Sequence, residues 1–379
     1  MTGFELTEDQ QAARDAAREF AEKRLKPAAQ GFDEEEAIPK EVYAEAASLG
    51  FFGLMVPEEF GGLALDPLAY AAVMEELARG CAPFQICLTV HNSLACGALL
   101  HAGTPEQKKR YLPSMASGER IGAYCLSEPG SGSDAASLTA SAVRDGDHFV
   151  LNGTKSWVSS AGFAGVFVVF VSTDRENRGV SCLLVDAGTP GLSLGKKEKK
   201  MGMRGSDTRE ISFKDCRVPA ANLVGAVNEG FKVAMALLDS GRIGIAAQSV
   251  GIAQAAFEEA LSYAKERKQF GKLLAQFQAT QFKLADMAVG IEAARLLTWR
   301  AARAIAKGKA TREASMAKLF ASETAARVTD EAVQLHGGNG YIREFAVERL
   351  YRDARVTRIY EGTSEIQRLV ISRELLKSA

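Results

Sequence analysis

The chain has 379 residues, and its content of 47% hydrophobic and 25% charged residues is ordinary for a soluble globular protein of two or three domains. The formal net charge of −1 argues against nucleic acid or an anionic membrane as a partner. We expect no membrane span, because no apolar run reaches bilayer length, and no signal peptide, because the N-terminus lacks a basic head and an apolar core.

The six cysteines and four histidines show no metal-ligand spacing. No two cysteines form a C-x-x-C pair, and no histidine clusters with them. We therefore predict free thiols in a reducing cytoplasm and no metal site.

The first third of the chain, residues 1–122, predicts a helical domain. Three of its helix starts carry a side-chain cap, and in two of them a proline follows in the first turn. The caps are Thr7 with Gln10, Asp66 with Pro67, and Thr104 with Pro105 and Gln107. We expect the first of these helices to stop near Pro27 and the second near Gly80.

The middle third, residues 123–227, reads as a series of short strands. Two hairpin dipeptides, Asp145-Gly146 and Asn152-Gly153, lie between runs that are rich in β-branched and aromatic residues. Strands that follow one another without intervening helices predict an antiparallel barrel or sandwich.

The last third, residues 228–379, returns to helix. Long Ala-rich segments with periodic apolar residues cover 229–266, 275–307 and 311–335. Short loops between them predict an antiparallel four-helix bundle. The fold class is therefore α+β, with helical, β and helical parts in that order.

A final helix is predicted after Glu361, within the stretch RIYEGTSEIQ. Ser364 and Gln367 fit a capping box, and Gly362 permits a sharp turn into the helix. Glu361 then lies just outside the helix. On local grounds it is either a solvated carboxylate near a helix N-terminus or a base that a loop presents to a reactive group.

Other stretches also allow both a structural and a functional interpretation. Residues 123–134 (AYCLSEPGSGSD) have glycines and hydroxyls that suit an anion or a ring, but they match neither the dinucleotide motif nor the P-loop. Trp157 fits either a core or a cofactor platform. Three further features read first as an ion pair or as helix C-caps: Asp239 with Arg242, residues 266–278 and residues 334–341.

Taken together, the motifs resemble those of the acyl-CoA dehydrogenase family over essentially the whole chain. The matching stretches, in order, are CLSEPGSGSD, LNGTKSWVS, KMGMRGSDT, FKDCRVP, ERKQFGKLL, QLHGGNGY and IYEGTSEIQRLV. The three-part plan is also that family's fold. VHNSL, LDSGRIGIAAQ and ARLLTWRAA are most similar to the short-chain, butyryl-type branch.

The resemblance implies an FAD-dependent enzyme that converts a short- to medium-chain acyl-CoA thioester to the trans-2-enoyl-CoA. Glu361 stands at the position of the family's catalytic base, and Gly241 at the position that carries the base in a minority of members. Glu361 would take the α-proton while the β-hydrogen leaves as hydride to the flavin. Its backbone N–H would help to stabilise the thioester oxygen, and closure over the substrate would raise its pKa.

The resemblance also assigns residues to the cofactor and the substrate. The FAD of the same subunit would be bound by Tyr124, Cys125, Leu126, Ser127, Gly132, Ser133, Trp157, Val158, Ser159, Thr363, Ser364 and Glu365. The FAD of a neighbouring subunit would be bound by Arg267, Phe270, Gln278, Gln334, Leu335, Gly337 and Gly338. The substrate would be bound by Ser133, Asp239, Ser240, Arg242, Tyr360 and Gly362.

A shared FAD implies a homo-oligomer, expected as a tetramer (a dimer of dimers), and the family's electron acceptor is an electron-transferring flavoprotein. Two alternatives are a flavin oxidase or monooxygenase on the same fold, and a non-catalytic helical assembly protein. A nicotinamide dehydrogenase is disfavoured, because no dinucleotide fingerprint follows a strand.

Overall fold

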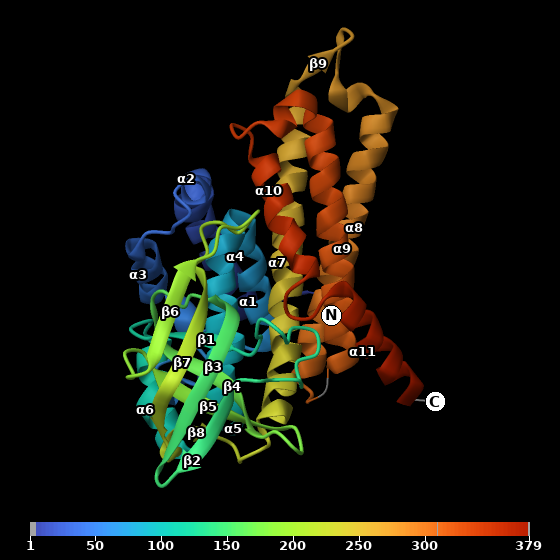
Figure 1. Cartoon of the computed structure of the whole chain (residues 1–379). Helices are drawn as coiled ribbons and strands as arrows, with labels where there is room; N and C mark the ends of the chain where they lie inside the picture. The colour runs from blue at the N-terminus through green and yellow to red at the C-terminus, as the bar shows by residue number, and fades with distance from the viewer. Residues whose placement is uncertain (1–4, 309, 378–379) are drawn as a thin grey trace.

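The computed structural model describes residues 5–308 and 310–377. Helices, then a β-sheet, then a second set of helices follow one another along the chain, which confirms the predicted order (Figure 1). The first strand begins at Ile121 and the helix after the sheet begins at Gly230, close to the predicted domain boundaries at 122 and 227.

The N-terminal part holds six of the described helices. They are α1 (Glu8–Phe20), α2 (Ala29–Glu34), α3 (Lys40–Ser48), α4 (Pro67–Thr89), α5 (Gly97–Ala102) and α6 (Pro105–Ala116). Both predicted capping boxes are present, at Thr7 and at Thr104, and Asp66 caps α4 by accepting from two backbone N–H groups. The helix that starts with α1 continues as a π-helical and a 3-10 turn as far as Ala28, near the predicted stop.

The helix that begins after Asp66 is interrupted at the predicted position, because α4 consists of two helical segments that meet at a kink beside Gly80. Cys81 alone has non-helical backbone angles there, with φ −161° and ψ 100°. Gly80 packs tightly on Ala21, whose side chain lies 2.8 Å from where a Cβ would stand. The glycine therefore lies at the end of the first helical segment and also permits a close contact with the helical turn that follows α1.

The stretch Pro67–Ala102 is long enough to cross a membrane and contains a window that is apolar enough to do so. The expectation that no apolar run reaches bilayer length is therefore wrong as far as length and composition are concerned. However, 89% of its most apolar window is buried inside the protein, as in the core helix of a globular fold.

The central sheet has eight strands in the order β6-β7-β3-β2-β4-β5-β8, with β1 paired to β4. The strands are β1 (Ile121–Cys125), β2 (Ser141–Asp145), β3 (His148–Ser159), β4 (Ala164–Asp174), β5 (Gly179–Asp186), β6 (Leu192–Lys197), β7 (Thr208–Pro219) and β8 (Leu223–Val224). Most pairs are antiparallel, as predicted, but β1 runs parallel to β4 and β2 touches β4 in parallel, so the sheet is mixed. Along β4, alternate residues face two different cores, one shared with the helices and one on the opposite face.

One of the two predicted hairpins is present. Gly146, with φ +61°, and Asp147 join β2 to β3. Asn152-Gly153 instead lies inside β3, where the register with β7 shifts and Gly153 has φ +135°. This bulge brings Gly153 so close to Ala140 that a Cβ would stand 2.5 Å from the Ala140 Cα, which is a common reason for glycine within a strand.

The C-terminal part is the predicted helical bundle. Its elements are α7 (Gly230–Glu266), β9 (Lys268–Gln269), β10 (Lys272–Leu273), α8 (Gln278–Ile305), α9 (Thr311–His336), α10 (Ala346–Ala354) and α11 (Ser364–Lys377). The helices α7, α8 and α9 lie side by side, with the β9–β10 hairpin at their far end (Figure 1). Helix α7 also packs along α4, so that it lies between the two helical parts.

Candidate active site

Glu361 lies on a tight turn between α10 and α11. Its φ is +55° and that of Gly362 is +90°, so two successive residues are in the left-handed region that a non-glycine residue rarely adopts. Two side chains hold the turn. Gln367 Nε2 donates to Glu361 O (3.1 Å) and Gly362 O (2.9 Å), and Lys318 Nζ donates to Gly362 O (2.6 Å).

The cap of α11 is Thr363 rather than the predicted Ser364. Thr363 Oγ1 accepts from Ile366 N at 3.3 Å. The Ser364 hydroxyl donates instead to Glu323 of α9 at 2.7 Å. The predicted capping box of Ser364 and Gln367 is therefore absent: the cap lies one residue earlier, and the Gln367 side chain binds the carbonyls of the turn.

The carboxylate of Glu361 is enclosed by α7. Its Oε2 is buried and has no hydrogen-bond partner among the described residues. A Cβ at Gly241 would stand 2.5 Å from Oε2 and 3.1 Å from Oε1, so the carboxylate occupies space that any other residue at 241 would fill. Burial raises the pKa of Glu361 to about 7, although the charges of Arg242 and Lys318 oppose that rise.

Three tyrosines lie around this carboxylate. The hydroxyls of Tyr70 and Tyr124 are buried and find no partner within the described part of the chain, whereas Tyr360 donates to Gln248. Burial, followed by the negative charge of Glu361, raises the pKa of Tyr124. Unpartnered buried polar atoms are rare in folded proteins. Their gathering around Glu361 suits a site that a polar ligand completes.

The residues predicted on α7 lie beside the base. Arg242 Nη1 donates to Asp239 Oδ1 at 3.0 Å, which confirms the predicted i, i+3 ion pair, and Thr311 donates to Asp239 Oδ2 at 2.6 Å. Arg242 is almost fully buried, and its charge acts on Glu361. Ser240 lines a cavity of about 90 Å³ together with Tyr70.

The predicted flavin loop leaves β1 at Tyr124 and Cys125 and is fixed against β3. Ser156 N donates to Ser127 O at 2.9 Å. The fully buried Lys155 donates to Leu126 O at 3.0 Å and to Glu128 Oε1 at 2.7 Å. This segment therefore has a fixed backbone next to the end of β3.

Trp157, at the end of β3, is 66% exposed and has φ +60°. A Cβ at Gly130 or Gly132 in the adjacent loop would meet nothing within 4 Å. An exposed indole beside an open glycine loop fits a flat aromatic cofactor such as a flavin. The side chains of Cys125 and Val158 belong to the sheet core, and Leu126 is buried too, whereas Ser133 is exposed and Ser159 is half-buried.

The second set of predicted cofactor residues lies at the far end of the bundle. Arg267 precedes the β9–β10 hairpin, Phe270 lies in its turn, and Gln278 begins α8. The remaining residues lie at or just after the end of α9: Gln334, Leu335, Gly337 and Gly338. Phe270 is 94% exposed. Figure 1 places this end of the bundle away from the sheet, so one chain does not bring the two sets of residues together.

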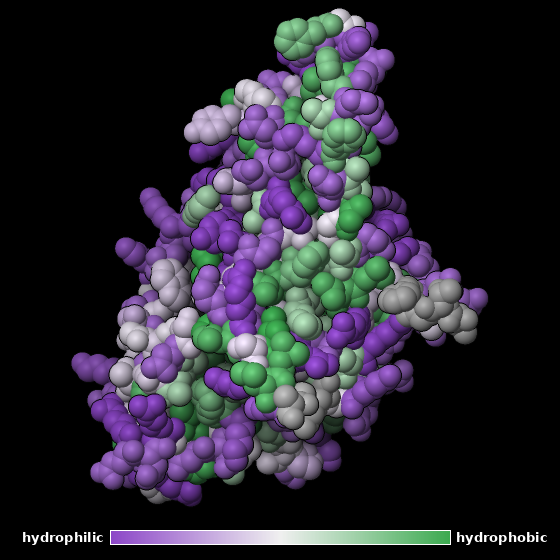
Figure 2. Space-filling model, turned by 90° about the vertical axis from the view of Figure 1, so that its right-hand side faces the viewer, coloured by the Kyte–Doolittle hydropathy of each residue, from purple (hydrophilic) through white to green (hydrophobic). Residues whose placement is uncertain are grey.

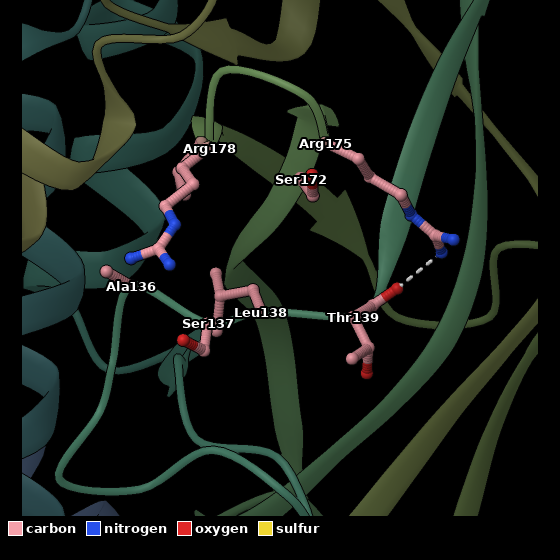
Figure 3. A pocket seen from close by; sticks show the side chains of 8 residues that line it. Ala136, Ser137, Leu138, Thr139, Ser172, Arg175 and Arg178 are labelled. Carbon is pink, nitrogen blue, oxygen red and sulfur yellow. Dashed lines mark hydrogen bonds between the residues drawn. The ribbon is translucent and has the colours of Figure 1, made fainter.

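A second cavity, of about 250 Å³, lies between residues 136–139 and the β4–β5 turn. Arg175 and Arg178 extend from that turn toward the loop, and Arg175 donates to Thr139 O at 2.9 Å (Figure 3). Two guanidinium groups give this hollow a positive potential. Its lining includes neither Glu361 nor the turn that carries it.

Several residues around the site are absent from the sequence prediction. They are Tyr70, Gln248 and Lys318. A signal for Lys318 exists in the sequence, since Thr311, Ser315, Lys318 and Ser322 recur at helical spacing within an Ala-rich segment.

Comparison with known proteins identifies the fold. Models of the acyl-CoA dehydrogenase N-terminal, middle and C-terminal domains match residues 7–119, 123–216 and 228–376. The mitochondrial short-chain specific acyl-CoA dehydrogenase of Bos taurus is 52% identical over 99% of this chain and 92% of its own.

Two solved structures are also similar over nearly their whole length. Butyryl-CoA dehydrogenase from Megasphaera elsdenii has a TM-score of 0.96 at 43% identity, covering 98% of this chain and 99% of its own. A chain in the structure described as the electron transferring flavoprotein of Acidaminococcus fermentans has a TM-score of 0.97 at 44% identity, covering 99% of both chains. The chain belongs to the acyl-CoA dehydrogenase family.

Proposed function

We propose that the chain is a short-chain acyl-CoA dehydrogenase whose catalytic base is Glu361. As a family member it is an FAD-dependent oxidoreductase that acts on the Cα–Cβ bond of an acyl-CoA thioester. The observation that carries the assignment of the base is the buried, unpartnered Oε2 of Glu361 against Gly241. A carboxylate in this state is a stronger base than one in water.

The residues of the turn explain how the base is presented. The hydrogen bonds from Gln367 and Lys318 fix the peptide groups on either side of Gly362, which orients the Glu361 side chain toward α7. A backbone N–H of this turn that donates to the thioester oxygen would acidify the α-carbon, an effect worth about 3–4 kcal/mol. Bound FAD supplies the acceptor for the β-hydrogen.

The space next to the base supports a short acyl chain. A Cβ at Gly244 would stand 2.7 Å from Thr89 Cγ2 and 3.0 Å from the Tyr70 hydroxyl, so α4 closes this region tightly. Thr89 in turn accepts from Gln85, at 2.7 Å. Little room remains for a long alkyl chain between α4 and α7.

We also propose a homotetramer that shares FAD between subunits, an electron-transferring flavoprotein as the acceptor, and a cytoplasmic location. Large apolar side chains exposed on the bundle support an assembly; they include Phe270, Phe282, Val289 and Leu376. Figure 2 shows apolar surface, in green, across the middle of the face on the side of α8 and α11. The six buried free thiols are compatible with a reducing compartment.

The role of Glu361 is tested by anaerobic reduction of the enzyme-bound FAD with butyryl-CoA, which is monitored by the loss of flavin absorbance. Glu361→Gln should retain FAD and lose nearly all reduction, because the amide cannot accept the α-proton. Glu41→Gln, an exposed carboxylate on α3, is the matched control and should behave as wild type. Reduction of Glu361→Gln at the wild-type rate would show that the base is another group.

The oxidase alternative is tested with the same protein. Wild-type enzyme reduced by butyryl-CoA should release little hydrogen peroxide in air and should pass its electrons rapidly to an electron-transferring flavoprotein. Rapid peroxide release without any acceptor protein would favour an oxidase on this fold.

A further inference from the structure

Helix α9 carries a line of polar residues on a buried face. Thr311, Ser315, Lys318 and Ser322 recur at intervals of four, three and four residues, which places them on one side of the helix. Ser315, Lys318 and Ser322 are each 0% exposed. Alanines surround them in the sequence, so these polar groups are not a solvated helix face and need partners inside the protein.

Three of the four residues find partners in the site around Glu361, whereas Ser322 donates to Leu319 O of its own helix at 3.2 Å. Thr311 donates to Asp239 at 2.6 Å, Arg242 donates to Ser315 at 3.5 Å, and Lys318 donates to Gly362 O at 2.6 Å. A turn further along, Glu323 accepts from the Ser364 hydroxyl at 2.7 Å and pairs with Arg358 at 3.1 Å. Helix α9 therefore contacts both the Asp239–Arg242 pair and the turn that carries the base.

Lys318 is unusual in this group because it brings a charge into the core. Its ammonium bonds the Gly362 carbonyl, and the groups that act on it electrostatically are Glu361, Arg242, Glu323 and Glu365. Burial lowers the pKa of Lys318 to about 8, and Glu361 is the foremost charge that opposes this. A buried ammonium is costly without a counter-charge, and the carboxylate with the strongest electrostatic effect on Lys318 is Glu361, whose turn it holds.

The surroundings of Glu361 show what Lys318 supplies in return. From α7 the carboxylate faces Arg242, from α9 it faces Lys318, and from α4, β1 and its own turn it faces the neutral hydroxyls of Tyr70, Tyr124 and Tyr360. Arg242 is already paired with Asp239. Lys318, in contrast, has no carboxylate partner within 4 Å among the ion pairs of the described residues. Its ammonium is instead hydrogen-bonded to the turn that carries Glu361.

We propose that Lys318 is a positioning residue for the reaction: its ammonium fixes the Gly362 carbonyl and supplies the positive charge that keeps Glu361 ionised in a buried site. The inference rests on the proposed role of Glu361 as the base. Lys318 acts through the turn and through the charge of Glu361 rather than by contact with the reacting carbon.

The consequence is a change in pH dependence that a purely structural lysine would not cause. Removal of this positive charge leaves Arg242 as the cation that still opposes the effect of burial, so the pKa of Glu361 rises. The base must be ionised to act, and the acid limb of kcat/KM therefore moves to higher pH. We expect Lys318→Met to move this limb by about one pH unit, which lowers kcat/KM about tenfold at pH values below both midpoints.

Three variants separate charge from geometry. Gln367→Met removes hydrogen bonds to the same turn without changing its charge, so it should lower kcat/KM by a similar factor at every pH and leave the midpoint in place. Lys283→Met, which removes a lysine paired with Glu331, is the control and should leave both the rate and the midpoint unchanged. An unchanged midpoint in Lys318→Met would overturn the inference.

A second readout does not depend on turnover. Urea unfolding of the holoenzyme at pH 7.5, between the two pKa values, is measured for Lys318→Met, Glu361→Gln and the double variant. Lys318→Met should lower the urea midpoint less in the Glu361→Gln background, because the carboxylate that it leaves unpaired is then absent. The inference would be overturned if Lys318→Met lowered the urea midpoint equally in the wild-type and the Glu361→Gln backgrounds. It would also be overturned if Lys318→Met failed to fold and Glu361→Gln did not restore folding. Full flavin reduction by Glu361→Gln would instead overturn the proposed function.

Discussion

At the scale of single residues, the reactivity of the site follows from burial more than from hydrogen bonding. Glu361 keeps one carboxylate oxygen without a partner among the described residues, and its two cationic neighbours act through space. This arrangement leaves the oxygen free to accept a proton. A hydrogen-bonded carboxylate would be easier to bury but would be a weaker base.

The raised pKa of Glu361 predicts the pH dependence of flavin reduction. Since the pKa is about 7, the carboxyl is protonated below that value and cannot take the α-proton. The rate of anaerobic reduction by butyryl-CoA should therefore rise about tenfold per pH unit on the acid side and level off above about pH 8. Stopped-flow absorbance between pH 5.5 and 9 measures it. A rate that is flat through neutrality would contradict the burial argument.

The sequence singled out Glu361, Asp239 and Arg242, and the structure brings these three together on the turn and on α7. Their local signals were an i, i+3 spacing and a carboxylate before a helix start. Tyr70 gave no such signal, because its role depends on α4 lying against α7, a contact between residues far apart in the chain.

At the scale of elements, the flavin loop depends on a buried ion pair. Lys155 and Glu128 are both nearly inaccessible, and Glu128 also accepts from Thr139 N and Oγ1 and from Ala140 N. Although burial raises the pKa of Glu128, Lys155 and Thr139 hold it below its usual value. The pair thus joins β3, the loop and the segment before β2.

Lys155→Met should destabilise the holoenzyme by about 3–5 kcal/mol, because it leaves the Glu128 charge buried and unpaired. Urea unfolding measures the loss, and the absorbance of retained FAD after gel filtration shows whether the loop still binds the cofactor. Lys155→Met with Glu128→Leu should recover much of the stability, and the exposed Lys214→Met is the control. A wild-type midpoint for Lys155→Met would show that the pair contributes little.

Local chemistry was a good guide where the partner of a residue is a neighbour in sequence. Thr7, Asp66 and Thr104 cap their helices as predicted, because each cap is completed within three residues. Prediction failed where a residue contacts an element that is distant in the sequence. Ser364 is bound by Glu323 of α9, and Gly153 sits at a bulge opposite β7 and against Ala140.

At the scale of the whole molecule, a charge cluster joins all three parts. Arg352 of α10 donates to Asp33 Oδ2 at 2.6 Å and to Met201 O at 3.1 Å, and Arg204 pairs with Glu36. One side chain of the bundle therefore contacts the N-terminal helices and the loop before β7. The order of the three parts was predictable from patterning, whereas this junction was not, because its members are more than a hundred residues apart.

The exposed bundle end predicts that assembly and FAD retention depend on each other. Phe270→Asp places a charge at a 94% exposed aromatic that we assign to a subunit contact. The variant should form a smaller species and lose FAD, as measured by light scattering after gel filtration and by flavin absorbance. Val143→Asp, at another exposed apolar residue on β2, should do neither. A tetrameric, FAD-replete Phe270→Asp would contradict a shared cofactor site.

The close approach of Glu361 to Gly241 has an evolutionary implication. Because the carboxylate fills the volume of the missing side chain, the two positions cannot both hold bulky residues. A lineage that moved its base from one position to the other would have to shorten residue 361 before, or together with, any enlargement of residue 241. Intermediates on that route would have either two crowded side chains or no base, so such a relocation is expected to be infrequent and abrupt.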